Sequence, residues 1–376
     1  MAFTPQDPEW HGEGDVRIHT EMVINEIYQI LESRAHQIPP GERLILILGA
    51  ALHDIGKVLT TKNEEIEGKD RVVSPHHAER GCSYVAPRMG ALGLAQPEAI
   101  QILGLIRYHH HVRKLVSRNS QQYEYCRLAR GVDLKLVYLL EQADNRGRIC
   151  DDIDSQIEVL ELFRLAAIEF GLWEMTDPYS AWRSFFEKEI PNPGEQEYAC
   201  CWAIHDYESG FINSPEEALA RTWQHRKKHS VVTVVCGPGG SGKSNWIENI
   251  CGPDDKKISL DEIRKEITGK SDDQSKNGQV VQLAKERLRQ ALREKQNVFW
   301  DSTALRRDGR SLILNLARDY HALTRVVSFG ISPHTAHTRN VSRKTPVPAS
   351  VIDKQFRQYQ WPAVHEAHLV DYLFDL

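Results

Sequence analysis

Two sets of side chains that could handle phosphate lie far apart in this sequence. The first is a series of histidines and aspartates spread over residues 19–144, with His53 and Asp54 adjacent within it. Imidazoles and carboxylates together suit divalent transition metals, and water bound to such a metal is a nucleophile near neutral pH. The second is the glycine-rich segment GPGGSGKS at residues 237–244. Its glycines let successive backbone N–H groups turn toward phosphate oxygens, so one chain carries the means both to remove and to add phosphate.

The His53–Asp54 pair interrupts an apolar helical segment, GAALHDIGK at residues 49–57. Burying an imidazole beside a carboxylate is unfavourable unless a metal or hydrogen bonds compensate. Other imidazoles and one carboxylate lie in neighbouring segments: His19, His76, His77, His109, His110, His111 and Asp144. This concentration favours a metal site. Spacing alone leaves open which of residues 76 and 77, and which of residues 109–111, face inward.

The order H…HD…H…H…D resembles that of the HD phosphohydrolase superfamily, whose helical fold binds one or two metals. The resemblance implies four primary metal ligands: His19, His53, Asp54 and Asp144. HGEGDVRIHT and HHAERG resemble segments of HD domains found with nucleotidyltransferases, which implies that His77 and His109 support the site or bind a second metal. His11 is an alternative first ligand, but His19 is favoured because it lies within a periodic helix.

Three cations near these positions could bind a substrate phosphate. Lys57 follows His53 by one helical turn, so it could pair with a phosphate oxygen. It could equally lie on the surface with only its aliphatic stem buried. Arg146 and Arg148 could likewise bind phosphate or cap the end of a helix.

The pattern GxxxxGK[ST] is matched at every defined position, between a β-branched run and a helical segment. Lys243 adds a positive charge at the β and γ phosphates, and the Ser244 hydroxyl is a Mg²⁺ ligand. The positive end of the following helix adds to the attraction for anions. The predicted binding site for ATP or another NTP with Mg²⁺ comprises Gly237, Pro238, Gly239, Gly240, Ser241, Gly242, Lys243 and Ser244.

Two later segments carry carboxylates suited to phosphoryl transfer. SLDEIRKEITG places Asp261 one helical turn before Arg264, on a common face. Asp261 could accept the proton of an attacking hydroxyl while Arg264 holds a neighbouring phosphate. VFWDST ends a strand with Asp301 and Thr303, where a carboxylate could support Mg²⁺ or its waters.

A third segment, TRNVSRKTPVPASVI, carries Arg339 and Arg343, four residues apart on one predicted helix face. Such a pair suits a lid that closes over the transferring phosphoryl group. The order GPGGSGKS, LDEIRKEITG, DST with ALRRDGR, and RNVSRKTPVP resembles the 5′-hydroxyl polynucleotide kinase family over about residues 230–376. In that family a P-loop core uses an Asp as general base, an Arg for the acceptor's phosphate and a two-Arg lid. The resemblance implies these roles for Lys243, Ser244, Asp261, Arg264, Arg339 and Arg343.

The elements that must position these groups fall into two classes. Apolar residues recur at intervals of three and four, which predicts helices at 16–35, 42–59, 97–116 and 133–149. From residue 230, helical segments alternate with β-branched runs at 230–237, 296–303 and 324–331, which predicts a parallel sheet covered on both faces. We expect a multidomain chain: an all-α HD-superfamily metal phosphohydrolase domain at 1–170, a helical bridge at 171–229 and an α/β P-loop kinase domain with a helical lid at 230–376. The side on which the bridge packs stays open.

Composition sets further limits. The chain has 376 residues, of which 41% are hydrophobic and 26% charged, and a net charge of −5. Any nucleic acid must therefore be held by local Arg and Lys clusters. The seven cysteines include no CxxC pair, which favours reduced thiols. No apolar run resembles a signal peptide or the ~18 apolar residues of a membrane span, so we expect a cytoplasmic protein that does not bind membranes.

A phosphoesterase and a polynucleotide kinase on one chain resemble bacterial end-healing enzymes. Many ribonucleases leave 2′,3′-cyclic phosphate and 5′-hydroxyl ends, which an ordinary ligase cannot join. We therefore expect a bifunctional enzyme that heals RNA or DNA strand ends, with an NTP donor and a functional link to an RNA ligase. Two alternatives stay open: an HD nucleotide hydrolase fused to a small-metabolite kinase, or one fused to an NTP-binding domain that regulates it without catalysis.

Overall fold

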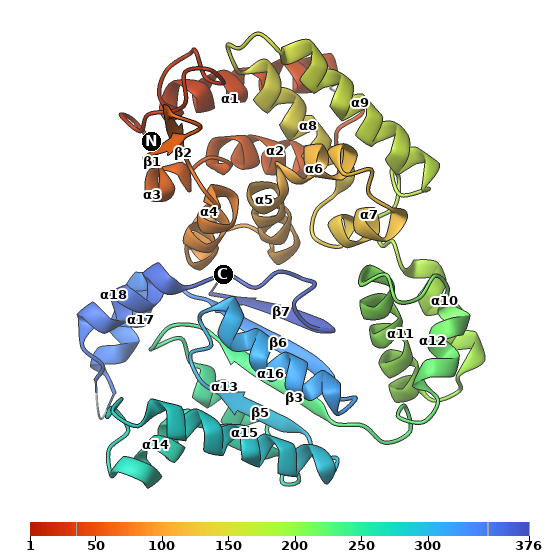
Figure 1. Ribbon diagram of the computed structural model, residues 1–376, viewed down its shortest axis with the longest axis vertical. Helices are drawn as coiled ribbons and strands as arrows, with labels where there is room; N and C mark the ends of the chain where they lie inside the picture. The colour runs from red at the N-terminus through yellow and green to blue at the C-terminus, as the bar shows by residue number, and fades with distance from the viewer. Residues whose placement is uncertain (35, 344–345, 376) are drawn as a thin grey trace. The chain divides into compact units, whose positions relative to one another are not determined.

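The chain folds into two units in a computed structural model that describes residues 1–34, 36–343 and 346–375 (Figure 1). One unit comprises Met1–Pro178 and the other Tyr179–Asp375. Ala35, the last residue of the first predicted helix, lies outside the described residues. Within the described ranges no helix is both long enough and apolar enough to cross a membrane. All seven cysteines are described, and all are free thiols.

The first unit is a helical bundle, as its apolar periodicity predicted. Its helices are α1 (Val16–Ser33), α2 (Pro40–Leu52), α3 (Lys57–Thr60), α4 (His77–Val85), the 3-10 helix η1 (Ala86–Leu92), α5 (Gln96–Tyr108), α6 (His111–Ser117), α7 (Gln122–Ala129), α8 (Leu134–Arg146) and α9 (Ile153–Glu169). Helix α2 packs on α1, α5 and α8, and its core includes the fully buried Val23, Leu46, Leu105 and Val137. These four helices carry or flank most of the histidines and aspartates identified in the sequence.

Two helices predicted as continuous are interrupted at histidines. His53 and Asp54 lie in a turn between α2 and α3, and His109 and His110 lie between α5 and α6. At each break the first histidine donates from Nδ1 to the carbonyl three residues earlier, at 2.8 Å for His53 and 2.9 Å for His109. Such local side chain–backbone bonds compete with the helical pattern. Apolar periodicity does not reveal them.

A short antiparallel hairpin, β1 (Lys62–Ile66) paired with β2 (Lys69–Val73), was not expected in this helical unit. Strand β1 is exposed along its whole length, so it lacks the apolar alternation that identifies a half-buried strand. Arg71 of β2 forms ion pairs with Asp7 and Glu9, at 2.5 and 2.6 Å. The hairpin thereby anchors the segment that precedes α1.

The second unit contains a five-stranded parallel sheet, which confirms the predicted α/β fold class. The strand order is β4-β5-β3-β6-β7. The strands are β3 (Val231–Cys236), β4 (Lys256–Ser259), β5 (Val298–Asp301), β6 (Leu323–Gly330) and β7 (Leu369–Phe374). The edge strands β4 and β7 were not identified in the sequence, because both are partly exposed and lack the continuous apolar run of a central parallel strand.

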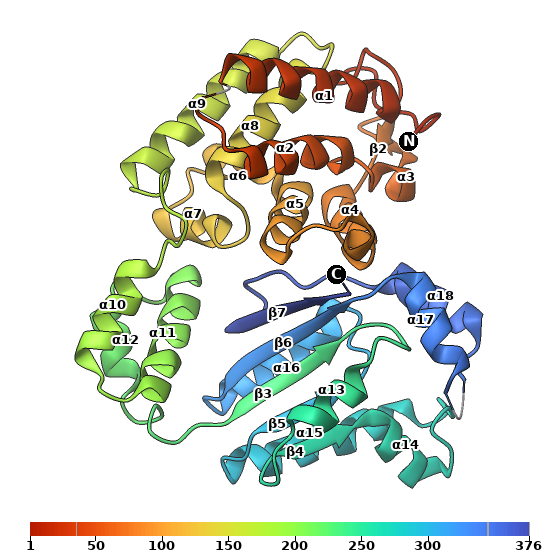
Figure 2. The same ribbon diagram turned by 180° about the vertical axis from the view of Figure 1, so that it is seen from behind.

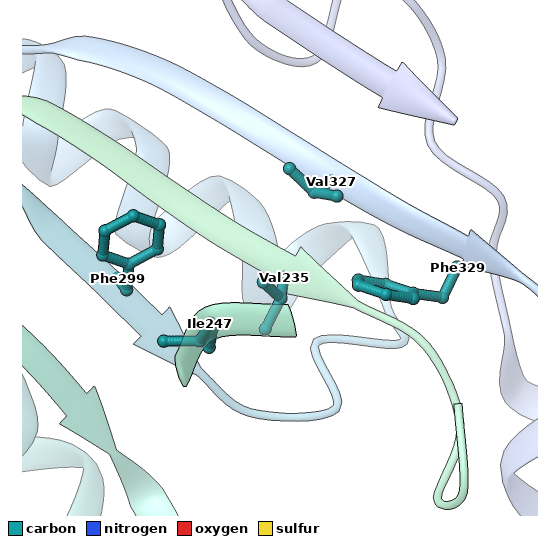
Figure 3. Close-up of a cluster of buried hydrophobic side chains, with 5 residues drawn as sticks. All are labelled: Val235, Ile247, Phe299, Val327 and Phe329. Carbon is teal, nitrogen blue, oxygen red and sulfur yellow. The ribbon is translucent and has the colours of Figure 1, made fainter. Parts of the chain in front are cut away.

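Helices cover both faces of this sheet, α16 over one face in Figure 1 and α13 over the opposite face in Figure 2. The helices of the unit are α10 (Ser180–Glu189), α11 (Pro193–Glu208), α12 (Pro215–Thr222), α13 (Lys243–Ile250), α14 (Leu260–Thr268), α15 (Asn277–Arg293), α16 (Arg307–Asp319), α17 (Pro333–Val341) and α18 (Ala349–Gln358). Figure 3 shows Ile247 of α13 within a buried cluster with Val235, Phe299, Val327 and Phe329 of the sheet. This contact holds the start of α13 at the carboxyl end of β3.

The segment predicted as a helical bridge packs on this sheet. Its helices α10, α11 and α12 belong to the second unit. Tyr198 and Cys201 of α11 pack on Leu323 of β6, and the Tyr198 hydroxyl donates to the His321 carbonyl at 3.0 Å. These contacts decide the side on which the segment packs, which the sequence had left open.

Candidate active sites

The predicted metal ligands of the first unit converge on one buried cluster. They come from five places in the fold: His19 in α1, His53 and Asp54 in the α2–α3 turn, His77 at the start of α4, His109 after α5 and Asp144 in α8. All of them except His77 are at most 1% exposed. Gly56 allows α4 to approach the α2–α3 turn, because a Cβ at this position would lie 1.9 Å from the His77 carbonyl oxygen.

Four of these histidines hold their rings in the same way. The Nδ1 atoms of His19, His53, His77 and His109 lie between 2.8 and 3.1 Å from backbone carbonyl oxygens. A carbonyl can only accept, so each Nδ1 carries a proton and each Nε2 is the atom left for the site. Metal-binding histidines are commonly oriented by such a bond from the second ring nitrogen. The structure thus leaves four Nε2 atoms available as candidate ligands.

The Asp54 carboxylate lies between two pairs of these Nε2 atoms. Its Oδ2 is 3.4 Å from His53 Nε2 and 3.8 Å from His19 Nε2. Its Oδ1 is 3.2 Å from His77 Nε2 and 3.9 Å from His109 Nε2. Ligands bound at ~2.1 Å from one metal are themselves separated by roughly 3–4 Å. The Asp54 carboxylate would therefore reach a metal held with His19 and His53 as well as a second metal held with His77 and His109.

Buried polar atoms in this cluster fit a bound cation. The ligand atoms of His19, His53 and Asp144 lie within 4.8 Å of one another. His53 Nε2 and Asp54 Oδ1 are buried without a hydrogen-bond partner in the described part of the chain. Burial opposes ionisation of Asp54 and Asp144, yet neighbouring positive groups hold the pKa of both carboxyls well below the usual range. Imidazoles with anionic carboxylates suit divalent transition metals, which would supply an activated water and polarise a phosphoryl oxygen.

The structure places His110 beside the candidate ligands His77 and His109, a choice among residues 109–111 that the sequence had left open. Nitrogen atoms of His77, His109 and His110 lie within 4.8 Å of one another. His76 is exposed, and His111 packs on α5 instead. Both candidate metal positions therefore have at least three nearby donors.

Lys57 points into the cluster rather than toward solvent. Its ammonium group lies 2.7 Å from Asp54 Oδ2 and donates to Gln6 Oε1 at 2.7 Å. The side chain is buried, so the alternative of a surface lysine with only its stem covered does not describe it. Gln6, which nothing in the sequence pattern singled out, reaches the site because the hairpin anchors its segment.

His11, the alternative first ligand, borders this site. Its Nε2 is 3.4 Å from Lys57 Nζ, and its Nδ1 is 2.8 Å from Glu13 Oε1. Glu13 also lies 2.9 Å from His19 Nδ1 and so helps to orient that ring. His19, in contrast, contacts Asp144 directly, its Nε2 2.9 Å from Oδ1. Glu13 is isolated among glycines in the sequence, where no periodicity marks it.

The two arginines that follow the ligand on α8 differ in their environment. Arg148 forms an ion pair with Asp144, whereas Arg146 is exposed. Glu141, one helical turn before Asp144, is buried, and both burial and the charge of Asp144 raise its pKa well above the usual range. Glu141 lies among apolar residues of a regular helix, so no sequence pattern marks it.

The second site begins with the loop between β3 and α13, the strand–loop–helix context that the GxxxxGK[ST] pattern requires. Lys243 opens α13, and its buried ammonium group donates to the Pro238 carbonyl at 2.8 Å and to Ser241 Oγ at 3.1 Å. The Gly237 N–H donates to the Thr303 carbonyl at 3.0 Å, which ties the loop to the segment after β5.

Glycine is required at the centre of this loop. Gly240 and Gly242 have φ values of 82° and 88°, a conformation that side chains disfavour. A Cβ on Gly240 would also lie 2.5 Å from the Ala336 carbonyl oxygen of α17. The loop and α17 can therefore be this close only with glycine at position 240.

Side chains from three further segments surround Lys243. Burial lowers the pKa of Lys243 to about 8; the negative charges of Asp301 and Asp261 oppose this shift and Arg343 adds to it. The Ser244 hydroxyl donates to Asp301 Oδ2 at 3.2 Å, which pairs the two predicted Mg²⁺-binding groups. The structure thus gathers the end of β5, the start of α14 and the segment after α17 around the loop.

Asp261 and Arg264 form an ion pair of 2.5 Å on α14. The Asp261 side chain is 75% exposed, whereas that of Arg264 is only 7% exposed. Arg264 Nη1 also donates to the Ser271 carbonyl at 2.9 Å, which fixes the guanidinium. Its Nε is buried and has no partner among the residues that the structure describes. This arrangement offers an accessible carboxylate beside an immobilised, unsatisfied N–H donor.

The two lid arginines do not share a helix face as predicted, because α17 ends at Val341 and Arg343 lies beyond it. Arg339 is on the helix, with Nη1 4.0 Å from the position of a Cβ on Gly242. Lys344 and Thr345 of the predicted lid segment lie outside the described residues.

Helix α18 also contacts the phosphate-binding loop, through Gln355, which no sequence pattern indicated. Gln355 Oε1 accepts a hydrogen bond from the Gly239 N–H at 2.6 Å. Ile352 packs with Ala336 and Ile331, which joins α18 to α17. Helices α17 and α18 therefore both pack against the phosphate-binding loop, near Gly240 and Gly239 respectively.

Comparison with known families identifies the two domains that carry these sites. Residues 16–155 match the HD domain family, and residues 232–362 match the AAA domain family. A search of curated proteins found no match to the chain. The protein therefore combines an HD hydrolase domain with a P-loop, kinase-like domain, which confirms the predicted fold class. HD domains depend on metals, and P-loop kinases use an NTP with Mg²⁺, in keeping with the two donor sets described above.

Proposed function

We propose that this protein heals broken nucleic-acid strands by acting on both kinds of end. The P-loop domain phosphorylates 5′-hydroxyl ends with ATP or another NTP, and the HD domain hydrolyses 2′,3′-cyclic phosphate or terminal 2′- or 3′-phosphate ends. The observation that carries the proposal is the Asp261–Arg264 pair beside Lys243. A phosphate-binding loop serves many kinases. An exposed carboxylate next to a fixed guanidinium suits an acceptor with a hydroxyl and a neighbouring phosphate.

Roles in phosphoryl transfer follow from these positions. The acceptor 5′-oxygen attacks the γ phosphorus while its proton passes to Asp261, and the bond to the β–γ bridging oxygen breaks to release the NDP. Arg264 binds the phosphate on the 3′ side of the acceptor nucleoside. Lys243 stabilises the donor phosphates, and Arg339 and Arg343 neutralise charge on the transferring group.

Roles in the HD domain follow from the ligand geometry. His19, His53, Asp54 and Asp144 would hold a first metal, and His77, His109 and His110 would hold a second together with Asp54. Lys57, 2.7 Å from Asp54, holds that carboxylate and is placed to pair with a phosphate oxygen of the substrate. Glu13 keeps His19 oriented through Nδ1.

One broken strand explains why both activities belong on one chain. Its 3′ side carries the cyclic phosphate, and its 5′ side carries the free hydroxyl. Removal of the first and phosphorylation of the second leave ends that a ligase can join. The partners are therefore RNA or DNA ends and an NTP, with an RNA ligase acting next, in the cytoplasm.

The kinase assignment is tested with γ-labelled ATP, Mg²⁺ and a 5′-hydroxyl RNA oligonucleotide. Transfer of label to the RNA is expected, and Asp261→Ala should reduce its rate on the order of 10²-fold or more. Glu262→Ala is the matched control, since Glu262 is the adjacent exposed carboxylate of the same helical turn. Label transfer to nucleosides but not to strands would instead support a small-metabolite kinase. Binding of ATP without any transfer would support a regulatory domain.

The hydrolase assignment is tested with an RNA that ends in a 2′,3′-cyclic phosphate. Metal-loaded protein should convert this end with one water to a 2′- or 3′-phosphate, or with a second water to a hydroxyl end and inorganic phosphate. His53→Ala should abolish this reaction while Lys243→Ala leaves it intact. Hydrolysis by the His53 variant at the wild-type rate would refute the metal site.

A further inference from the structure

A buried carboxylate lies beside the HD site without a role in the ligand sets described so far. Glu141 is on α8, one helical turn before Asp144, and is only 3% exposed. Its Oε1 has no hydrogen-bond partner among the described residues. Buried carboxylate oxygens are normally hydrogen-bonded or bound to a cation, because desolvation of an unpaired charge is unfavourable. Glu141 therefore requires a partner that the neighbouring side chains do not supply.

The arginines near Glu141 do not satisfy this oxygen. Arg148 forms its ion pair with Asp144, and Arg113 has an exposed side chain. The remaining charged groups near Glu141 include two further carboxylates, Asp144 and Asp54. An added positive charge at this place would relieve the repulsion between carboxylates.

The imidazole of His110 lies close to Glu141, at a distance that suits two ligands of a shared ion. His110 Nδ1 is 3.8 Å from Glu141 Oε1, which is too long for a hydrogen bond. It suits two ligands of one metal, since bonds of ~2.1 Å place ligands roughly 3–4 Å apart. One donor atom each from His110, Glu141 and Asp144 all lie within 4.8 Å of one another.

We propose that His110, Glu141 and Asp144 form an additional divalent-cation position at the edge of the HD site. One nitrogen and two carboxylate oxygens suit Mn²⁺ or Zn²⁺. The inference rests on the HD metal site of the proposed function, because Asp144 belongs to both.

The His110 ring connects this position with the second HD metal. Its other nitrogen, Nε2, is 3.1 Å from His77 Nε2. A neutral imidazole has one lone pair for a metal, so His110 serves one of the two positions at a time. The second HD metal then retains His77, His109 and Asp54. The additional cation is therefore the one bound last and lost first.

Metal stoichiometry tests the proposal. Full-length protein is stripped with a chelator, titrated with Mn²⁺ and analysed for bound metal per chain. Glu141→Gln should bind one equivalent fewer than the wild type while keeping the remaining equivalents. Glu158→Gln, which alters an exposed carboxylate of α9, is the matched control and should bind the wild-type number.

Thermal unfolding provides a second test, because the proposal and a purely structural role for Glu141 predict opposite changes in melting temperature in chelator. In chelator, Glu141→Gln should melt at a higher temperature than the wild type, because it removes a buried carboxyl group that lies beside other carboxylates and has an oxygen without a hydrogen-bond partner. Mn²⁺ should raise the melting temperature of the wild type by more than that of the variant. A purely structural Glu141 would lower the melting temperature in both conditions.

The outcomes separate this inference from the proposed function. Equal Mn²⁺ stoichiometry and affinity in wild type and Glu141→Gln would overturn the additional position and leave the HD metals intact. Absence of Mn²⁺ from the wild type itself would refute the HD metal site as well. If Glu141→Gln does not fold, Glu141→Leu, which fills a similar volume without a ligand atom, gives the same comparison.

Discussion

Replacement of Arg264 by alanine tests what the kinase domain phosphorylates. Arg264 Nη1 already donates to Ser271, and Nε is the buried donor left for an acceptor phosphate. A hydrogen bond to a charged partner contributes about 1.5–3 kcal/mol. Its loss should therefore lower kcat/KM for a phosphate-bearing acceptor by about 10- to 150-fold.

The assay compares two acceptors in two proteins. A nucleoside 3′-phosphate carries the phosphate that Arg264 would bind, and the parent nucleoside lacks it. Wild-type protein should prefer the phosphorylated acceptor, and Arg264→Ala should lose that preference with little further loss on the nucleoside. Such non-additivity isolates the Arg264–phosphate contact from general damage. The KM for ATP should stay near that of the wild type, because the loop and lid hold the donor.

Arg287→Ala is the matched control for this experiment. Arg287 lies on α15 and pairs with Glu266 of α14, the helix that carries Arg264, but the Arg287 side chain is 42% exposed. It should leave the preference between acceptors unchanged. Equal losses on both acceptors in Arg264→Ala would show that Arg264 only supports α14. Weaker ATP binding with unchanged acceptor binding would place Arg264 in the donor site and favour a small-metabolite kinase.

Three other substitutions or conditions test the two sites separately. Asp54→Asn should remove bound metal and phosphoesterase activity but spare 5′-phosphorylation; parallel metal analysis and both activity assays check this, and loss of both activities would point to unfolding. Gly240→Ala should weaken NTP binding, since a left-handed alanine is strained by about 1–2 kcal/mol and its Cβ would meet the Ala336 carbonyl oxygen. Equilibrium binding measures that loss, and wild-type affinity would contradict the close approach of α17. NTP affinity should fall as pH rises through about 8, because Lys243, with its pKa lowered to about 8, is positively charged below that pH and neutral above it. A pH titration of the Kd should show this fall in the wild type but not in Lys243→Arg, and an equal fall in both would assign it to another group.

Features that depend only on residues close together along the chain were predictable from the sequence. The phosphate-binding loop needs a strand before it and a helix after it, and all three are continuous from Val231 to Ile250. The helical periodicity of α1 and α8 and the apolar runs of β3, β5 and β6 are equally local signals. The alternation of strands and helices after residue 230 then led to a parallel sheet, because such strands need crossovers on its faces. The order of these local patterns along the chain was therefore sufficient to predict the fold class.

Only the tertiary structure decided which side chains meet at each site. His110 lies with His77 and His109 where the chain turns between α5 and α6, whereas His76, before α4, is exposed. Glu141 and Gln355 lie in regular helices, where no spacing distinguishes them from ordinary helical residues. Their importance comes from what approaches them across the fold: a second carboxylate and an imidazole in one case, a backbone N–H in the other. Periodicity determines which face of an element is buried, whereas long-range packing determines what that face contacts.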